Sequence, residues 1–315
     1  MQADSTYNQA PTRWGILSAA NIAVKRVIPA IMSSASEDLL AVASRDLARA
    51  QSLLGHLPGV RLYGDYENLL RDPEIDAIYI PLPNSLHAEW TIRALQAGKH
   101  VLCEKPLAIT AEEGMSMVEA ARANDRLLME AFMYRFHPQT VLALEEAHSG
   151  RIGAIKLVRS SFSFNLLIPP RPHDIRLQAS LAGGSLMDVG CYAVNFCRAV
   201  YRHAPVAVAA RVSAPRPGEV ERSTAAVLDF GEGRFGLIDS SFELPTRQVS
   251  EIIGELGTIT IPLPFTPFHL DTEVILNLQD QVIHRRITGI DQYRLEVEHF
   301  GSCIRTGTHP VLSLA

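Results

Sequence analysis

The sequence predicts an α/β protein in which a doubly wound parallel sheet is followed by an α+β domain with a large, open, mostly antiparallel sheet. Three observations predict this class. Short β-rich runs alternate with helical segments in the first part of the chain, and strands follow one another at short spacing in the rest. The length of 315 residues favours two domains.

The first part of the chain has the alternation typical of βαβ units. Strands are expected at 14–18, 39–43, 61–63, 77–81, 100–104 and 127–133, and helices at 21–34, 46–54, 66–71, 85–97 and 111–124. Strands separated by helices of this length pair in parallel through crossovers. Because such crossovers are right-handed, a doubly wound sheet is the leading topology.

The second part predicts a sheet of closely spaced strands. Helices are expected at 139–149 and 184–201, and strands at 154–164, 206–212, 224–230, 234–242, 250–254, 258–261, 273–278 and 282–288. Short turn-rich joints indicate antiparallel pairing. We therefore expect a polar tail at 1–12, a dinucleotide-binding domain at 13–134 and a substrate-binding domain at 135–315. Helices on one sheet face leave the other to be buried, which predicts a homodimer or homotetramer through this sheet.

Composition excludes several classes of function. Apolar residues make up 47% of the chain, charged residues 20%, and the net charge is -5, with lysines and arginines scattered, so a nucleic-acid partner is not expected. No apolar run reaches the roughly 18 residues of a membrane span. The start lacks the features of a signal peptide, which favours a cytoplasmic location. Four cysteines and eleven histidines form no recognisable ligand cluster, so no metal is expected.

The first strand leads into a turn of small residues. A dinucleotide fingerprint has Gly-x-Gly-x-x-Gly here, whereas this chain has Gly15, then Ser18 and Ala20, with Asn21 and Ile22 at the start of the helix. Small residues let the backbone approach a pyrophosphate at the positive end of a helix. Taken alone, a β-to-α turn without a ligand explains the segment equally well.

The end of the second strand bears on which cofactor is bound. Ser44 and Arg45 lie where an NAD site usually carries an acid for the ribose 2′-hydroxyl. A serine and a guanidinium suit a 2′-phosphate better. NADP(H) is therefore expected, with NAD(H) possible. Asp46 keeps open the alternative that Arg45 only begins a solvent-facing helix.

The fourth strand ends in a proline-rich loop that contains Pro81, Leu82, Asn84 and His87. Its prolines stiffen a segment expected to face the nicotinamide end of the cofactor. For Asn84, the alternative is a role as helix cap, alone or shared with Ser85.

The fifth strand ends in Glu104-Lys105-Pro106. Proline removes a backbone donor and disfavours helix in the preceding residue, so the strand ends here. Ligands bind at the carboxyl ends of strands in open α/β sheets, which makes Lys105 the first catalytic candidate. Glu104 joins it as a candidate cofactor contact.

Three candidates for substrate binding lie in the second part. Asp188 and Tyr192 are four residues apart, so a helix places them on one face, and Gly183-Gly184 before them lets the backbone approach a ligand. Arg176, in a rigid polar loop, is a candidate contact, although a simple surface loop explains it nearly as well. Tyr134 and His87 are further candidates for the cleft.

Four stretches together resemble the Gfo/Idh/MocA oxidoreductase family: Gly15-Ile16, PNSLH at 83–87, EKP at 104–106 and GGSLMDVGCY at 183–192. The Tyr192 form of the last, preceded by EAFMYRFHP at 130–138, is similar to the branch of glucose–fructose oxidoreductase, xylose dehydrogenase and dimeric dihydrodiol dehydrogenase. The resemblance implies a Rossmann domain followed by an open-sheet domain. Relatives usually continue past Pro310 into another helix, so a shortened end or a missing last helix is expected.

The resemblance also implies chemistry. Lys105 would be catalytic with a cis Lys105–Pro106 bond, Lys105 and Tyr192 would form the acid/base pair, and Asp188 would orient sugar hydroxyls and Lys105. Which of the pair carries the proton is left open. The expected function is NADP(H)-dependent hydride transfer between nicotinamide and a hydroxyl-bearing carbon of a sugar or polyol. The alternatives are a trans-dihydrodiol dehydrogenase or keto-sugar reductase, a nicotinamide-dependent glycosidase, and a cofactor-binding sensor without catalysis.

Overall fold

The computed structural model describes residues 10–312, which form two compact units. Of the described residues, unit 1 comprises 10–131 and 293–312, and unit 2 comprises Phe132–Gln292. Residues 1–9 of the expected tail lie outside the described residues, and Thr12 already belongs to the first strand. The sequence-based division left the end of the chain in the second domain, whereas the structure returns it to unit 1.

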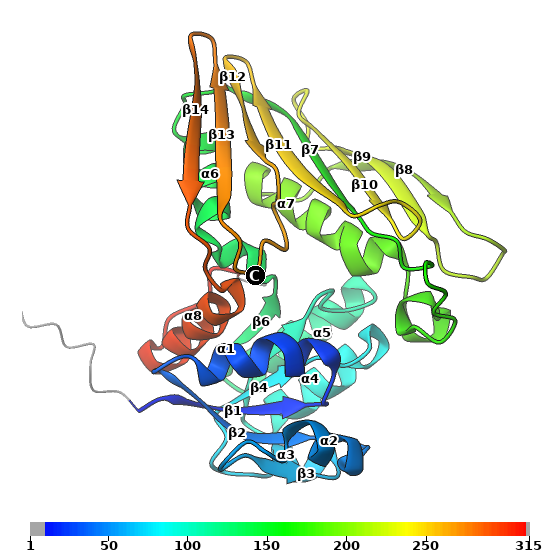
Figure 1. Ribbon diagram of the computed structural model, residues 1–315, viewed down its shortest axis with the longest axis vertical. Coiled ribbons are helices and arrows are strands. Elements are labelled where there is room, and N and C mark those ends of the chain that lie inside the picture. Colours follow the sequence, from blue (N-terminus) through cyan, green and yellow to red (C-terminus); the bar gives the residue numbers. More distant parts are fainter. Residues whose placement is uncertain (1–9, 313–315) are drawn as a thin grey trace, which may run out of the picture. The chain divides into compact units, whose positions relative to one another are not determined.

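Unit 1 is built on a six-stranded parallel sheet in the order β3-β2-β1-β4-β5-β6 (Figure 1). Its strands are β1 (Thr12–Leu17), β2 (Glu37–Ala43), β3 (Arg61–Tyr63), β4 (Ala77–Ile80), β5 (His100–Glu104) and β6 (Leu128–Ala131). This order confirms the doubly wound Rossmann topology, with the reversal of strand order between β1 and β4, where ligands bind in such sheets.

Six α-helices of the described chain belong to unit 1. They are α1 (Ile28–Met32), α2 (Leu47–Leu54), α3 (Tyr66–Leu70), α4 (His87–Gln96), α5 (Ala111–Ala123) and α8 (Gln292–Thr306), the last starting one residue before the boundary between the units. Asp46, Asp65 and Thr110 accept backbone N–H bonds at the starts of α2, α3 and α5. Residues of α3, α4 and α5 form one apolar core with the strands.

Helix α8 was not predicted, and buried polar contacts attach it to the sheet. Arg305 Nη1 lies 2.9 Å from Glu37 Oε1, and Trp14 Nε1 donates to Glu37 Oε2 at 2.7 Å. The Trp14 ring also packs on Phe300, with centroids 5.9 Å apart. Burial is the main reason that the pKa of Glu37 is raised, against the lowering effect of these donors. The end of the chain thus completes the core of unit 1.

Unit 2 contains an eight-stranded sheet in the order β14-β13-β12-β11-β7-β10-β9-β8. Its strands are β7 (Ile155–Ser163), β8 (Ala207–Ser213), β9 (Ser223–Asp229), β10 (Phe235–Ser241), β11 (Arg247–Gly254), β12 (Gly257–Ile261), β13 (Thr272–Leu278) and β14 (Gln281–Ile287). Only β7 and β10 pair in parallel among its described strands, which confirms the mostly antiparallel prediction.

Two helices of unit 2, α6 (Pro138–His148) and α7 (Cys191–Tyr201), lie on the same face of this sheet (Figure 1). On β7 to β11 a broad hollow of about 760 Å³ is lined by small and charged residues, among them Ala225, Val227, Asp239 and Arg247. Val227 is 39% exposed. Within the part of the chain that the structure describes, no helix is both long and apolar enough to cross a bilayer.

Candidate active site residues in the two units

The turn after β1 contains a residue in an unusual backbone conformation. Ser18 has a φ of 107°, in the region that favours glycine, and its N–H donates to Ala43 O at 2.8 Å. A non-glycine residue there costs about 1–3 kcal/mol, and such strain clusters at functional sites. The helical residues begin at Asn21, and a π-helical turn, Ala23–Val27, follows at once. Ser18, Ala20, Asn21 and Ile22 thus form the turn that the sequence predicted.

Gly15 has a packing role that the sequence did not predict. It lies inside β1, and a Cβ added there would come within 2.8–3.0 Å of the side chains of Leu69, Ile75 and Ile78. The glycine therefore lets the core pack against the strand, upstream of the turn itself. Sequence alone indicates that something approaches a glycine closely, but not what it is.

The three polar residues after β2, Ser44, Arg45 and Asp46, have different roles in the structure. Asp46 is the N-cap of α2 and accepts from Arg49 N at 2.9 Å, while Ser44 Oγ bonds to the backbone of Asp46. Arg45 between them is exposed. The aspartate that left the cofactor preference open is therefore occupied by helix capping, and Arg45 is the charged side chain presented at this end of the sheet.

The loop after β4 is mostly buried. Pro81 and Leu82 are buried, and His87 is fully buried with its ring nitrogens each 2.8 Å from a carbonyl oxygen, of Pro106 and of Leu82. Burial is the largest cause of the lowered pKa of His87, so at neutral pH the ring donates one of these bonds. These three residues hold the loop in place rather than presenting free polar groups. Asn84 is partly exposed and begins the 3-10 turn Asn84–Leu86 that leads into α4, so its capping role stays a prediction.

Lys105 follows β5 at its carboxyl end, and the Lys105–Pro106 bond is cis, as expected from the resemblance. Glu104 is held from two sides: it accepts from Tyr79 Oη at 2.5 Å through Oε1 and from Lys105 N at 3.2 Å through Oε2. Tyr79 is fully buried. The next turn is fixed by Leu107 N, which donates to Glu130 Oε1 at 2.8 Å. The lysine is therefore carried on a turn anchored to two neighbouring strands.

In unit 2, Tyr192 lies in a cluster of aromatic rings and is 5% exposed. Four rings lie 5.3–5.8 Å from its own, centroid to centroid. They belong to Phe132, Tyr134, Phe162 and Phe265. The Tyr192 hydroxyl lies 3.5 Å from Met133 Sδ, a weak acceptor. This packing fixes the ring in one orientation.

Asp188 and Arg176 form an ion pair, with Arg176 Nε 2.8 Å from Asp188 Oδ2. The Asp188 charge is the main cause of the raised pKa of Arg176, and Asp174 adds a second contact at 3.3 Å. Asp188 lies in a π-helical turn, Leu186–Gly190, that precedes α7, and π turns of this kind are frequent at functional sites. The structure thus joins two residues that the sequence proposed separately.

The glycine pair before this turn packs closely against protein. Gly184 has a φ of 116°, and a Cβ there would lie 2.3 Å from the Glu221 carboxylate. A Cβ on Gly183 would lie 2.3 Å from Arg176 O. Glu221, which the sequence did not single out, accepts from Leu186 N at 2.7 Å. The glycines therefore allow the close backbone packing that places Asp188, and their approach to a ligand stays a prediction.

Tyr134 differs from its predicted role as a substrate contact. It is fully buried, and its hydroxyl donates to Asn195 Oδ1 at 2.5 Å. Arg135 Nη1 donates to the same oxygen at 3.2 Å. Because the Tyr134 ring packs on Tyr192, Tyr134 supports that residue from behind.

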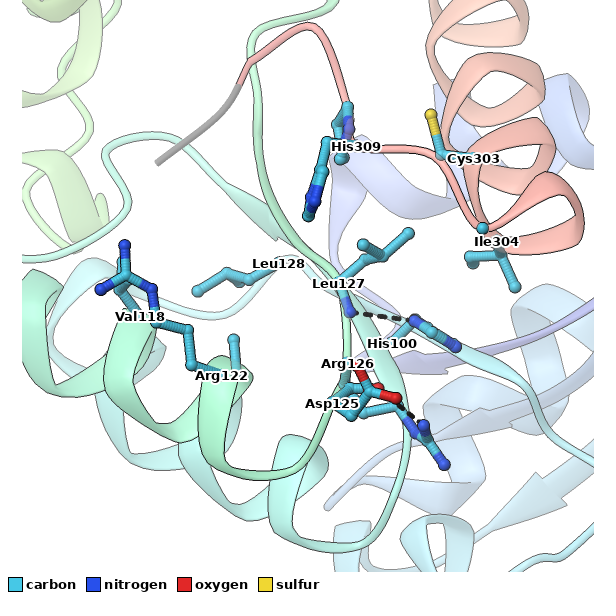
Figure 2. Close-up of a pocket in the computed structure, with 13 residues that line it drawn as sticks. His100, Val118, Arg122, Asp125, Arg126, Leu127, Leu128, Cys303, Ile304 and His309 are labelled. Carbon is cyan, nitrogen blue, oxygen red and sulfur yellow. Dashed lines mark hydrogen bonds between the residues drawn. The ribbon is translucent and has the colours of Figure 1, made fainter. Parts of the chain in front are cut away.

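A cavity of about 600 Å³ in unit 1 lies away from these residues, at the amino ends of β5 and β6 (Figure 2). His100 lines it and accepts from Leu127 N at 3.0 Å. Burial first, then the charge of Arg126, lowers the pKa of His100 to about 4. None of the predicted site residues lines this cavity. In open α/β sheets ligands bind at the opposite, carboxyl edge.

A Rossmann sheet with a small-residue turn and a lysine at the end of β5 defines a nicotinamide-dependent oxidoreductase. Residues 12–132 match the family model described as oxidoreductase family, NAD-binding Rossmann fold, and residues 142–260 match the GFO/IDH/MocA C-terminal domain. The chain belongs to the Gfo/Idh/MocA family. It is an NAD(P)-dependent dehydrogenase or reductase that acts on CH–OH groups.

Known relatives cover nearly the whole chain. D-xylose 1-dehydrogenase (NADP(+)) 2 of Haloferax volcanii is 40% identical over 301 residues, 94% of this chain and 90% of the relative. Trans-1,2-dihydrobenzene-1,2-diol dehydrogenase of Xenopus tropicalis is 30% identical over 317 residues, 96% of this chain and 93% of the relative. A 3-ketoreductase from Actinomadura kijaniata, solved with NADP and TDP-benzene, has a TM-score of 0.87 at 32% identity and covers 96% and 92% of the two chains. These relatives confirm the branch that the sequence indicated.

Proposed function

We propose that this protein is an NADP(H)-dependent oxidoreductase that transfers a hydride between nicotinamide and a hydroxyl-bearing carbon of a sugar or polyol. The observation that carries the proposal is Lys105, fixed at the carboxyl end of β5 by the Glu104 and Tyr79 hydrogen bonds. The xylose dehydrogenase relative supports the substrate class. A cytoplasmic location remains a prediction.

The preference for NADP(H) is supported by Arg45. Its side chain is exposed at the end of β2, and the neighbouring Asp46 is engaged in capping α2. A guanidinium can bind a 2′-phosphate through two charge-assisted bonds, whereas an NAD site needs a free acid. The xylose dehydrogenase relative is named for NADP(+), and the 3-ketoreductase was solved with NADP. The small residues of the Ser18 turn leave the backbone accessible to a pyrophosphate, so the residues present fit a nicotinamide dinucleotide.

The chain's own residues supply proton transfer and orientation. A bound nicotinamide supplies the hydride acceptor or donor. Lys105 or Tyr192 would move the proton of the substrate hydroxyl, since each can serve as a general acid or base. Asp188 would accept hydrogen bonds from sugar hydroxyls. The Arg176 ion pair stabilises Asp188 as a carboxylate, so Arg176 acts through Asp188 in this proposal.

The alternative substrate classes keep the same chemistry. The diol dehydrogenase relative favours a cyclic trans-diol, and the ketoreductase structure favours a keto-sugar. Incubation with NADP⁺ and a panel of aldoses, inositols and trans-diols, followed by absorbance of the reduced nicotinamide, distinguishes a sugar or polyol substrate from a trans-diol. Oxidation of added NADPH in the presence of a keto-sugar identifies a keto-sugar reductase.

The role of Lys105 is tested by Lys105→Met. We expect kcat to fall by about 10²–10⁴-fold, the usual contribution of a positioned acid or base. Lys156→Met is a matched control, because Lys156 is an exposed lysine whose ion pair within the described chain is with Glu255, at 3.0 Å. Full turnover by folded Lys105→Met would refute the mechanism.

We also propose a homodimer or homotetramer through the hollowed face of the eight-stranded sheet. Helices cover the other face, and small residues next to paired charges, as in the Arg247–Asp239 contact of 3.3 Å, suit a self-complementary interface. Val227→Glu would place a charge in this face and should give a monomer in light scattering. Val282→Glu on the edge strand β14 should leave the mass unchanged. A monomeric wild type at micromolar concentration would contradict the proposal.

A further inference from the structure

A buried carboxyl group lies in the core of unit 1 without an assigned role. Glu296, on α8, is 1% exposed, and its Oε1 atom has no hydrogen-bond partner in the described chain. An unpaired carboxylate at such a position would be very unfavourable, since burial of an isolated charge costs far more than burial of a neutral polar group. At this position the neutral, protonated form of Glu296 is therefore favoured over the carboxylate.

The charge that acts on Glu296 is that of the glutamate in the Glu104-Lys105-Pro106 turn. The two carboxyl groups are close enough to interact electrostatically, and Tyr79 and Tyr293 are the other titratable groups whose interactions link them. Glu104 lies at the end of β5, Tyr79 on β4, and Tyr293 and Glu296 on α8. Two carboxyl groups that interact in a buried site cannot both ionise easily, so a single proton is held by one of them.

The hydrogen bonds decide which carboxyl group holds that proton. Glu104 accepts from the Tyr79 hydroxyl at 2.5 Å and from Lys105 N at 3.2 Å, and donors of this kind stabilise an ionised carboxylate. Glu296 is fully buried, and burial, followed by the Glu104 charge, raises its pKa well above the usual range. Hydrogen-bond donors therefore favour the ionised form of Glu104, whereas burial favours the protonated form of Glu296.

We propose that Glu296 is a positioning residue that remains a neutral carboxylic acid, so that Glu104 stays ionised and keeps Lys105 in place. The inference rests on the proposed function, because Lys105 is the catalytic group that it serves. Ionisation of Glu296 would set two negative charges against each other behind the Lys105 turn. Repulsion between them would loosen the contact between Glu104 and Tyr79. The last helix of the chain, which the sequence did not predict, would thus control the setting of the catalytic lysine.

Glu296→Gln tests the proton directly, because glutamine has the shape of the neutral acid and cannot ionise. A folded-state pKa raised above the unfolded-state value means that wild-type stability is lost as the pH rises from the unfolded pKa through the folded pKa. We expect the unfolding constant of wild type, divided by that of Glu296→Gln, to rise by about tenfold per pH unit in this window. Glu298→Gln, two residues on in α8 and 34% exposed, is the matched control and should follow wild type.

Infrared spectroscopy gives a second readout that needs no substrate. The difference spectrum of wild type minus Glu296→Gln at pH 7 should contain the carbonyl band of a protonated carboxylic acid, which leaves out any band from another buried carboxyl group, Glu37. A difference spectrum without this band, or the same pH dependence of unfolding in both proteins, would overturn the assignment of the proton. These measurements stand even if Lys105→Met retains turnover, so failure of the proposed function and failure of this inference are distinguishable.

The positioning role is tested by the pH profile of kcat. Glu296→Gln should keep kcat and KM within about threefold of wild type at pH 7, because the neutral form is preserved, whereas the alkaline fall in kcat should move to higher pH. A merely structural residue would leave that limb in place, and such a result would refute the role. A 100-fold loss of kcat in a folded Glu296→Gln protein would also refute it, by showing that an ionised or proton-donating group is needed.

Discussion

Tyr192→Phe separates the chemistry of Tyr192 from its packing. The variant removes the hydroxyl and keeps the ring, which four aromatic neighbours hold at centroid distances of 5.3–5.8 Å. The variant removes the hydroxyl's contact with Met133 Sδ at 3.5 Å, and loss of a side-chain hydrogen bond typically costs about 0.5–1.5 kcal/mol of folding stability. Loss of a general acid or base should lower kcat by about 10²–10⁴-fold.

Tyr192→Ala provides the contrast. Removing a buried aromatic side chain from a close-packed cluster costs about 3–5 kcal/mol, and each lost ring pair adds about 0.5–1.5 kcal/mol beyond the buried area. The alanine variant should therefore lose both stability and activity, whereas the phenylalanine variant should lose activity alone.

The assays are urea unfolding and steady-state kinetics with the substrate found in the panel. NADPH binding, followed by fluorescence, should be unchanged in Tyr192→Phe because the cofactor residues lie in unit 1. A Tyr192→Phe enzyme with wild-type kcat would show that the hydroxyl carries no proton in the reaction. The acid/base role would then belong to Lys105 alone.

Three further predictions concern unit 1. Ser18→Gly should raise the free energy of unfolding by about 1 kcal/mol in urea titrations, because glycine relieves the positive φ of 107°; a less stable variant would show that Ser18 is not strained. Arg305→Met should cost about 3–5 kcal/mol by leaving Glu37 buried without its cation. Since the folded pKa of Glu37 is already raised and loss of Arg305 raises it further, this deficit should grow as the pH rises through the folded pKa values, and a constant deficit would contradict the ion-pair account. Arg45→Ala should weaken NADPH binding by about 10–100-fold with little change for NADH, and equal Kd values for the two proteins would exclude the 2′-phosphate contact.

The sheet could be predicted from sequence because its signals are local. The strand ends at Ala43 and Glu104 follow from apolar runs broken by polar residues or proline, and both match the structure. Helix α8 was missed because its buried face carries Glu296 and Arg305, which interrupt the apolar period that identifies a helix. Contacts with residues far away in the sequence hold these polar groups in the interior, and such contacts cannot be predicted from the local sequence.

In the candidate site, too, features set by local sequence signals could be predicted and features set by long-range contacts could not. The position of Lys105 follows from where a strand stops, so sequence was sufficient. The close packing at Gly15 and Gly184 could not be predicted, because a glycine indicates a close neighbour without naming it, and here the neighbours are core side chains and Glu221. Asp46 was ambiguous until the start of α2 was seen, since a cap and a ribose ligand call for the same side chain.

The return of the chain to unit 1 after residue 292 makes unit 2 an insertion within the nucleotide-binding unit. A protein truncated after residue 134 would lack Phe300 and Arg305 and would expose Trp14 and Glu37. An engineer who wishes to exchange substrate domains between relatives should therefore treat 132–292 as a cassette and keep both flanking pieces together. The nucleotide-binding unit cannot be complete until the ribosome has made the last helix.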